Sequence, residues 1–384
     1  MKKITILGAI LSLIFYLSCS STDIVTVADR KPDLSGTPYS YSKLALPTKS
    51  VFGNVTHIGI GECGGCFTDF NKNPLEITDA GATLGRVLFY DKKLSLNNTV
   101  ACGSCHHQSK AFSDGEQLSE GFQGKITGRN SMAISNPFML NNLFWDSRSS
   151  SIEDLSLRPV QNHIEMGMEN LNDLVRKLTK TDYYEPLFLA AYRSEEITPQ
   201  KISNAIAQFV GSITSNQSKF DQSDTDANLS SLEKMGKVVF MGKGKCLNCH
   251  AGVNFSAPDG PFDAYGGGGE GGIDEKGTAN IGLDLVYNDN GRRDGKFRIP
   301  SLRNVELTAP YMHDGRFKTL EEVVDHYSEG IKAHQSLDKA FKDSKGNLKQ
   351  LHLDPLEKTA LIAFLKTLTD QSFITNPKYG DPFK

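Results

Sequence analysis

The sequence predicts a mainly α-helical fold in two halves related by internal duplication, with long loops between the helices. Several segments carry apolar residues at helical spacing behind N-terminal capping residues, alternating strand patterns are sparse, and one set of residues occurs twice in the same order. With 384 residues and 38% apolar composition, the chain can bury one large or two medium cores. We expect four regions: 1–19, 20–73, 74–222 and 223–384.

The first residues, MKKITILGAILSLIFYLSCSST, are typical of an export signal. Two lysines precede an apolar run that is too short for a transmembrane helix. Ser18-Cys19 resembles the end of a bacterial lipoprotein signal, in which the cysteine is lipidated, although Tyr16 is unusual at that place. An ordinary cleaved signal peptide is the alternative. We therefore expect a periplasmic protein, attached to a membrane if Cys19 carries a lipid.

The net charge of −3 leaves no basic surface of the kind that binds nucleic acid. The seven cysteines carry a stronger signal, because six of them form three C-x-x-C pairs. Such a pair in an exported protein forms a disulfide, binds a metal or anchors a haem, and the next residue distinguishes these uses. Cys63 and Cys66 have no following histidine, so we expect a disulfide there, with a metal site as the alternative.

Two segments, ACGSCHH and KCLNCHA, contain the C-x-x-C-H pattern that attaches a c-type haem. Two thiols bond the porphyrin vinyl groups, and the adjacent histidine binds the iron through an imidazole nitrogen. The sequence thus predicts two covalent haems, held by Cys102, Cys105 and His106 in the first half and by Cys246, Cys249 and His250 in the second.

Each haem motif follows a similar helix and precedes a similar turn. Residues 84–106 and 235–250 share a Gly-basic-Val-apolar-Phe helix end before the motif. Downstream, FWDSRSSSIEDLSLRP (144–159) aligns without a gap with MHDGRFKTLEEVVDHY (312–327). The chain is therefore predicted to contain a duplicated haem domain.

Three further helices are predicted from their caps. TPQKISNAIAQFVGSIT begins with Thr198 as N-cap and a proline in the first turn, and DPLEKTALIAFLKTL repeats this arrangement from Asp354. Thr319 and Glu322 form a predicted capping box at the start of the helix that leads to Tyr327.

The aligned turns predict unequal haems. Tyr327 lies 14 residues after His313, whereas Pro159 lies 14 residues after Trp145. Proline has no side-chain donor atom, so the first iron is expected to be open and the second to be six-coordinate. An open iron binds ligands and a closed one transfers electrons.

The two haem motifs, FWD, PVQNHIEMG and LRNVELTAPYMHDGRF, in this order, resemble the bacterial diheme cytochrome c peroxidases, and the MauG-like branch in particular. The resemblance extends over about residues 74–370. It implies two cytochrome c-like domains: an N-terminal peroxidatic haem, a C-terminal electron-transfer haem and one Ca²⁺ between them.

The resemblance also implies roles for single residues. His106 and His250 match the proximal ligands, Glu165 the distal acid-base carboxylate and Trp145 the tryptophan between the haems. The calcium positions match Asn130, Thr308 and Pro310, the last two through backbone carbonyls, which suits an oxygen-seeking cation.

The chain departs from the classical pattern at three places. Phe122 replaces the removable histidine over the peroxidatic iron, which implies an open site, as in the MauG-like branch. Leu155 replaces a glutamine near bound peroxide. Trp145 is the only tryptophan, so the surface tryptophan through which MauG oxidises a partner protein is missing.

These features predict an enzyme that reduces hydrogen peroxide to water. Glu165 would transfer the peroxide proton, Trp145 would connect the haems, and a small periplasmic donor, a cytochrome c or a cupredoxin, would supply electrons. A MauG-like oxidase of a protein or small organic substrate is the alternative. A plain diheme electron carrier is a third hypothesis, and it predicts two six-coordinate haems.

For two roles, the sixth iron ligand and the partner of the haem propionates, the sequence offers two candidate residues each. The sixth ligand of the second iron is predicted to be Tyr327, because of its place in the repeat and in the family pattern, with Met312 as the alternative. Arg298 and Arg303 flank IPSL, and both are candidates to pair with haem propionates.

Overall fold

The computed structural model describes residues 30–36, 38–54, 75–140, 142–223, 225–257 and 276–383. The export signal with Cys19, the Cys63/Cys66 pair and most of the glycine-rich segment 258–277 lie outside these residues. Helices dominate the described chain, as predicted, and its strands are two short antiparallel pairs.

The first half contains α1 (Asp79–Tyr90), α2 (Cys102–Cys105), α3 (Ile152–Ser156), α4 (Arg158–Gln161), α5 (Leu171–Thr179), α6 (Tyr184–Tyr192) and α7 (Pro199–Gly211). The second half contains α8 (Ser231–Met241), α9 (Leu320–Asp325), α10 (Pro355–Lys366) and α11 (Gln371–Thr375). The strand pairs are β1 (Lys49–Ser50) with β2 (Gly53–Asn54) and β3 (Thr278–Ala279) with β4 (Phe297–Arg298). Among the described residues, no helix is both long and apolar enough to cross a membrane.

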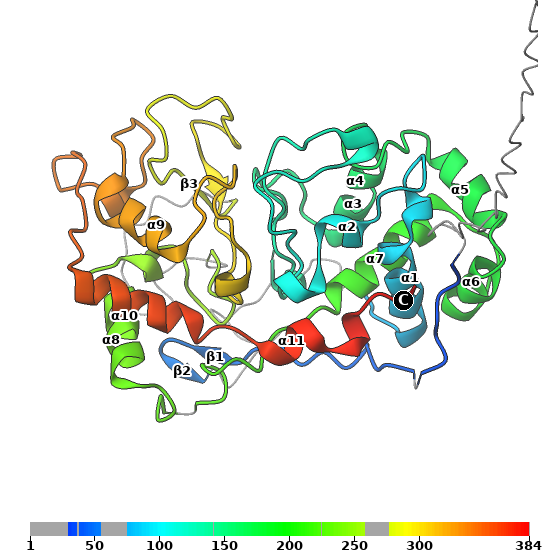
Figure 1. Ribbon diagram of the computed structural model, residues 1–384, viewed down its shortest axis with the longest axis horizontal. Helices are drawn as coiled ribbons and strands as arrows, with labels where there is room; N and C mark the ends of the chain where they lie inside the picture. The colour runs from blue at the N-terminus through cyan, green and yellow to red at the C-terminus, as the bar shows by residue number, and fades with distance from the viewer. Residues whose placement is uncertain are drawn as a thin grey trace, which may run out of the picture.

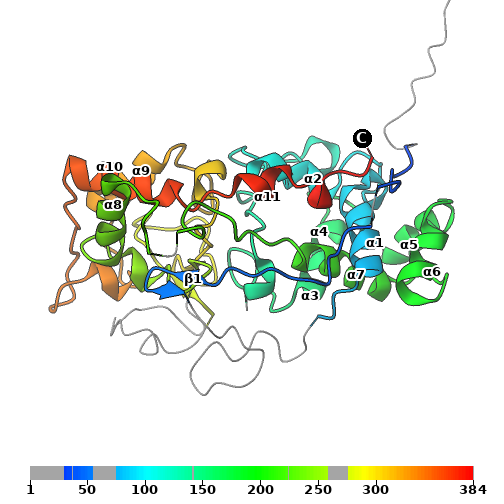
Figure 2. The same ribbon diagram turned by 90° about the horizontal axis from the view of Figure 1, so that it is seen from below.

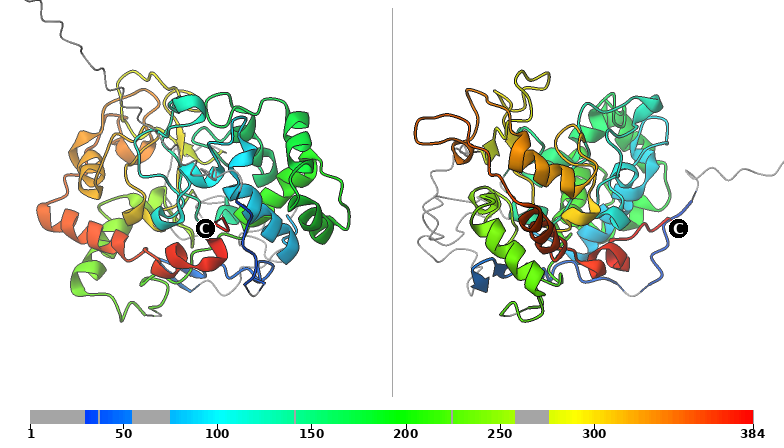
Figure 3. Two further views of the ribbon diagram at one scale, coloured as in Figure 1. Left: turned by 45° about the vertical axis from the view of Figure 1, so that its right-hand side comes forward. Right: turned by 60° about the vertical axis from the view of Figure 1, so that its left-hand side comes forward.

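The described chain forms two lobes, each built on one pair of crossed helices (Figures 1 and 3). In the first lobe α1 packs on α7, and in the second α8 packs on α10. A glycine permits the close approach in both pairs. A Cβ atom at Gly85 would lie 1.9 Å from the carbonyl oxygen of Ala205, and one at Gly236 would lie 1.9 Å from that of Ala360.

The predicted helix caps are confirmed. Thr198 accepts a hydrogen bond from the backbone N–H of Lys201, with Pro199 as the first helical residue of α7. Asp354 starts α10, and Thr319 starts α9, each with a complete capping box. These local interactions account for the helix boundaries that the sequence predicted.

Each lobe buries its own hydrophobic core. In the first, Phe89 packs edge-on against Phe209, with ring centroids 5.3 Å apart, and in the second Phe240 packs on Phe364, also at 5.3 Å. Such tilted aromatic pairs are favourable beyond their buried area. Because the pairs join α1 to α7 and α8 to α10, the same packing recurs in both halves.

An asparagine fastens each half to the segment that follows its second helix. Asn136 (φ 49°) accepts a hydrogen bond through Oδ1 from Ser215 N at 2.7 Å, and Asn304 (φ 61°) accepts one from Asp370 N at 2.8 Å. Asparagine tolerates this left-handed backbone better than most residues. We call this arrangement the asparagine bracket, and it occurs once in each half.

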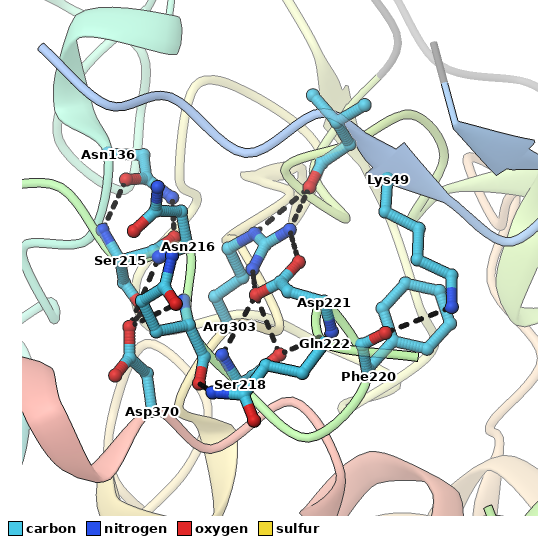
Figure 4. A network of polar contacts seen from close by, with 12 residues as sticks. Lys49, Asn136, Ser215, Asn216, Ser218, Phe220, Asp221, Gln222, Arg303 and Asp370 are labelled. Atoms are coloured by element: carbon cyan, nitrogen blue, oxygen red, sulfur yellow. Dashed lines mark hydrogen bonds and ion pairs between the residues drawn. The ribbon is translucent and has the colours of Figure 1, made fainter. Parts of the chain in front are cut away.

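The linker between the halves is held by buried polar groups (Figure 4). The Asp370 carboxylate accepts hydrogen bonds from Ser215 Oγ and from the backbone N–H of Asn216. Arg303, fully buried, donates two hydrogen bonds to Asp221, at 2.8 and 2.9 Å. This bidentate pair satisfies both charges inside the protein.

The two ends of the described chain cross between the lobes in opposite directions (Figure 2). The N-terminal segment 38–54 leaves the first lobe and reaches the second, where Lys49 donates a hydrogen bond to Phe220 O at 3.0 Å. The C-terminal segment returns, so that Tyr379 packs in the first core and its carbonyl accepts from Tyr90 OH at 2.7 Å. Both crossings tie the lobes together.

Candidate functional site

The first C-x-x-C-H motif lines a cavity of about 460 Å³ in the first lobe. Cys102 and Cys105 occupy the single turn of α2, and His106 follows as its C-terminal cap. The His106 Nδ1 atom hydrogen-bonds the carbonyl oxygen of Phe112 at 2.8 Å. Burial lowers the pKa of His106, so the ring is neutral and Nε2 keeps the lone pair that a metal needs.

The second motif repeats this geometry in the other lobe, in a cavity of about 200 Å³. Cys246 opens a single 3₁₀ turn, and His250 Nδ1 hydrogen-bonds Phe255 O at 3.1 Å. Burial lowers the pKa of His250 to about 4. The two sites therefore present the same donor set, two thiols and one neutral imidazole.

This donor set fits two c-type haems. All four cysteines of the motifs are free of disulfides, and all four line the cavities with their histidines. A carbonyl acceptor on the far nitrogen of each imidazole is the usual way in which proteins orient a histidine ligand. The thiols and imidazoles are thus positioned as covalent attachment and axial ligation require.

Glu165 lies in the wall of the first cavity. Asn162 donates a hydrogen bond from Nδ2 to Glu165 Oε1 at 2.9 Å, which fixes the carboxyl group. Burial raises the pKa of Glu165, while the charge of Arg148 and the Asn162 hydrogen bond oppose the rise. A carboxyl group with a raised pKa holds a proton more readily than an ordinary carboxylate and can still return it.

Phe122 packs beside Glu165 outside the lining of this cavity. Its backbone N–H donates to the carbonyl oxygens of Ile164 and Glu165, at 2.8 and 2.9 Å. Its ring lies over Gly167, where an added Cβ would approach within 2.7 Å. Phe122, predicted to stand where classical relatives have a histidine, therefore packs against the 164–167 backbone and does not line the cavity.

Trp145 lies at the junction of the lobes and lines both cavities. Its indole Nε1–H donates to Asn130 O at 2.9 Å, and its own carbonyl accepts from Arg298 N at 2.7 Å. Asn130 N in turn donates to His313 O at 2.8 Å. In the repeat, Trp145 aligns with His313. The same alignment, extended towards the N-terminus, pairs Asn130 with Arg298. Each half therefore donates one backbone N–H to the other half, and the two hydrogen bonds join equivalent positions.

The residues at the end of the aligned turns face different cavities. Pro159 and Leu155 line the first, and Tyr327 lines the second together with Met312. Tyr327 lies in a single π-helical turn after α9, and no described group hydrogen-bonds its hydroxyl. Burial and the nearby cysteine thiols raise its pKa.

The three predicted calcium positions are brought together at the second cavity. Asn130, Thr308 and Pro310 line it, although they come from opposite halves. Asn130 donates from Nδ2 to the carbonyls of Glu116 and Gln117, at 3.0 and 3.2 Å, which leaves Oδ1 as the free end of its amide. Within the described residues, no N–H donates to that oxygen or to the carbonyls of Thr308 and Pro310.

The structure separates the two arginines that the sequence left equivalent. Arg303 is engaged with Asp221, whereas Arg298 lines both cavities and forms no ion pair with any described carboxylate. Sequence reasoning also missed Asn162 and Arg148, the two neighbours that act on Glu165. The signal for Arg148 was present, because the repeat pairs it with Arg316.

Comparisons with known proteins identify the family of this chain. A family model described as di-haem cytochrome c peroxidase matches residues 79–228. The methylamine utilization protein MauG of Methylophilus methylotrophus is 30% identical over 77% of this chain and 84% of its own length. Cytochrome c551 peroxidase of Nitrosomonas europaea is also 30% identical, over 75% of this chain and 79% of its own.

Among solved structures, a MauG-like protein associated with microbial copper homeostasis is 32% identical, with a TM-score of 0.69, and the match covers 82% of this chain and 98% of that one. Fold, donor sets and relatives agree. The chain therefore belongs to the di-haem cytochrome c peroxidase and MauG family of oxidoreductases, which carry two c-type haems.

Proposed function

We propose that this protein is a cytochrome c peroxidase that reduces hydrogen peroxide to water in its first cavity. The observation that carries the proposal is the difference between the two cavities. The first contains Glu165 and has Pro159 where the second has Tyr327. Relatives named cytochrome c peroxidase at about 30% identity support peroxide as the substrate.

Glu165 is proposed as the acid-base residue. It takes the proton from one peroxide oxygen and delivers it to the other, so that water is the leaving group, and such positioned transfer typically contributes about 10²–10⁴-fold in rate. Asn162 holds the carboxyl group in place. Leu155 supplies no polar contact, so Glu165 carries the proton transfer without the glutamine of classical relatives.

Haem iron, when bound, supplies the redox chemistry of this reaction, and His106 and His250 are proposed to hold the two irons. Trp145 lines both cavities and is proposed to connect them electronically. Tyr327 is proposed to close the second iron, which would leave that site to electron transfer. Two electrons per peroxide would enter, one from each of two molecules of a small donor protein, a cytochrome c or a cupredoxin, and two protons from solvent would complete the two waters.

A second candidate is a MauG-like oxidase of a protein or small organic substrate. Relatives named MauG, and a MauG-like solved structure at 32% identity, favour it. Against its protein-oxidising form, Trp145 is the chain's single tryptophan and lies at the junction of the lobes.

The test is steady-state peroxide consumption with a panel of reduced cytochromes and cupredoxins, combined with spectra of the ferric protein. The peroxidase predicts donor-dependent consumption and one high-spin haem. Failure to consume peroxide with any of the donors, together with one high-spin haem, would favour the oxidase, and two low-spin haems would indicate an electron carrier. Replacing Trp145 by phenylalanine should slow turnover with protein donors and leave both haems attached.

We also propose the internal duplication, with haem domains at 74–222 and 223–384. The recurring glycine contacts, aromatic pairs and asparagine brackets support it. One Ca²⁺ is proposed at Asn130, Thr308 and Pro310, since their three oxygens suit a hard cation. The export signal at 1–19 and a lipid on Cys19 stay predictions.

A further inference from the structure

Arg298 is a buried cation, and no carboxylate among the described residues forms an ion pair with it. The residue is 7% exposed, and burial lowers its pKa to about 10. Its Nε donates to Phe144 O at 3.2 Å, and its Nη2 lies 3.4 Å from the Met132 sulfur. Neither contact balances a full positive charge, and an uncompensated buried charge is strongly unfavourable.

Other arginines at this junction are balanced by carboxylates. Arg129 pairs with Asp146 and Asp289, and Arg303 with Asp221. Arg298 instead lines both haem cavities. A c-type haem keeps two carboxylates on its porphyrin edge after its vinyl groups are bonded. When the haems of this family are bound, these carboxylates are the anions expected near Arg298. The forked guanidinium can form two parallel hydrogen bonds to a carboxylate.

The repeat gives a second argument. Asn130 occupies the aligned position in the other half and makes the matching backbone hydrogen bond to His313. The free Oδ1 atom of Asn130 is proposed to bind a metal cation, whereas the side chain of Arg298 is itself a cation. The junction thus has one proposed site for an exchangeable metal cation, at Asn130, and one cationic side chain, that of Arg298. Both residues line both cavities.

We infer that Arg298 is the counter-ion of haem carboxylates on both sides of the junction, and a positioning residue that raises the reduction potentials of both haems together. A positive charge stabilises the reduced iron relative to the oxidised iron, because reduction lowers the charge of the centre. This inference rests on the two haems that the family carries, and it does not depend on which reaction they perform.

The experiment is a spectroelectrochemical titration of both haems in the full-length holoprotein. Arg298→Gln should lower both midpoint potentials, with both haems still covalently attached. Arg298→Lys keeps one charge but loses the fork, so it should lower at least one potential, by less than the glutamine does. Arg158→Gln, which removes a surface charge paired with Asp154, is the matched control and should change neither.

Several outcomes would overturn the inference. Potentials that stay at the level of the Arg158→Gln control in Arg298→Gln mean that Arg298 only supports the backbone at Phe144. A fall in one potential alone means that it serves a single haem. If Arg298→Gln fails to fold, Arg298→Lys decides, and two unchanged potentials there reject the inference. None of these results depends on peroxide turnover, so a failed peroxidase assignment would be seen separately.

Discussion

The two halves place the same haem-binding loop on the same helix pair, yet they differ where the ligand would enter. In both, the imidazole donates to a backbone carbonyl six or five residues later, Phe112 or Phe255. The aligned turn then ends on Pro159 in the first half and on Tyr327 in the second. The same arrangement of helices and loops thus presents a proline to the first cavity and a tyrosine to the second.

The arginines of the aligned turns differ in a similar way. Arg316 is held by Asp284 and Asp314, each within 2.6 Å of Nη2. Within the described residues, Arg148 pairs with Asp146 alone and is the one cation that acts on Glu165, and its side chain is 42% exposed. In the half that contains Glu165, the arginine of the aligned turn is therefore held by fewer carboxylates than its counterpart in the other half.

The sharpest test of this comparison is Glu165→Gln. We expect peroxide turnover to fall about 10²–10⁴-fold, with both ferric haem spectra unchanged, because the proton carrier is lost and the ligands are kept. The wild-type rate should fall as the pH is lowered through the pKa of Glu165, which burial raises above its ordinary value, and the variant should lose this limb. Exposed Glu169→Gln is the control, and equal loss in both variants would contradict the assignment.

The second test addresses the sixth ligand proposed for the second haem iron. Tyr327→Phe should convert the second haem from low to high spin, since the phenol oxygen is removed while the ring is kept. Met312→Leu should leave the ferric spectrum unchanged. The measurement is electron paramagnetic resonance of the ferric protein. The reverse pattern, with the change in Met312→Leu, would assign the ligand to sulfur.

The third test addresses the cation between the halves. Removing Ca²⁺ with a chelator should lower the free energy of unfolding, by about 2.7 kcal/mol if calcium is present at a hundredfold excess over its Kd. Differential scanning calorimetry measures the loss. Asn130→Leu should unfold at the same temperature with and without chelator, and a variant that still responds would place the ion elsewhere.

The smallest effect is expected on the free energy of unfolding, at the helix pairs that are packed alike in the two halves. Gly85→Ala and Gly236→Ala should each destabilise the protein by about 1–3 kcal/mol, because the added methyl meets a backbone carbonyl of the facing helix. Gly36→Ala, which meets nothing within 4 Å, should stay within about 0.5 kcal/mol in the same urea titrations. A neutral result at one glycine alone would show that the helix pairs are not packed alike.

Local patterns predicted much of this fold. The haem loops, the caps at Thr198, Thr319 and Asp354, and the mainly helical class depend on residues close in sequence. The lining of opposite cavities by Pro159 and Tyr327 followed from an ungapped repeat, because equal spacing after equal turns gives equal positions.

Long-range contacts were not predictable in this way. Arg298 and Arg303 have similar neighbours in sequence, and only the tertiary fold brings Asp221 to one of them. The asparagine brackets join residues from separate segments, such as Asn136 and Ser215, and no local periodicity indicates them.

The crossing chain ends have a consequence for the order of folding. The backbone of Asp33 donates to Pro382 O, and Tyr41 OH donates to Lys378 O, so residues 378–382, far away in sequence, complete the first lobe. Contacts between such distant residues close large loops and slow folding. Without residues 378–382, Phe112 would lose the ring of Tyr379, whose centroid lies 6.5 Å away, and the first core would be incomplete. We therefore expect the first lobe to reach its final packing only once residues 378–382 have crossed back from the second lobe.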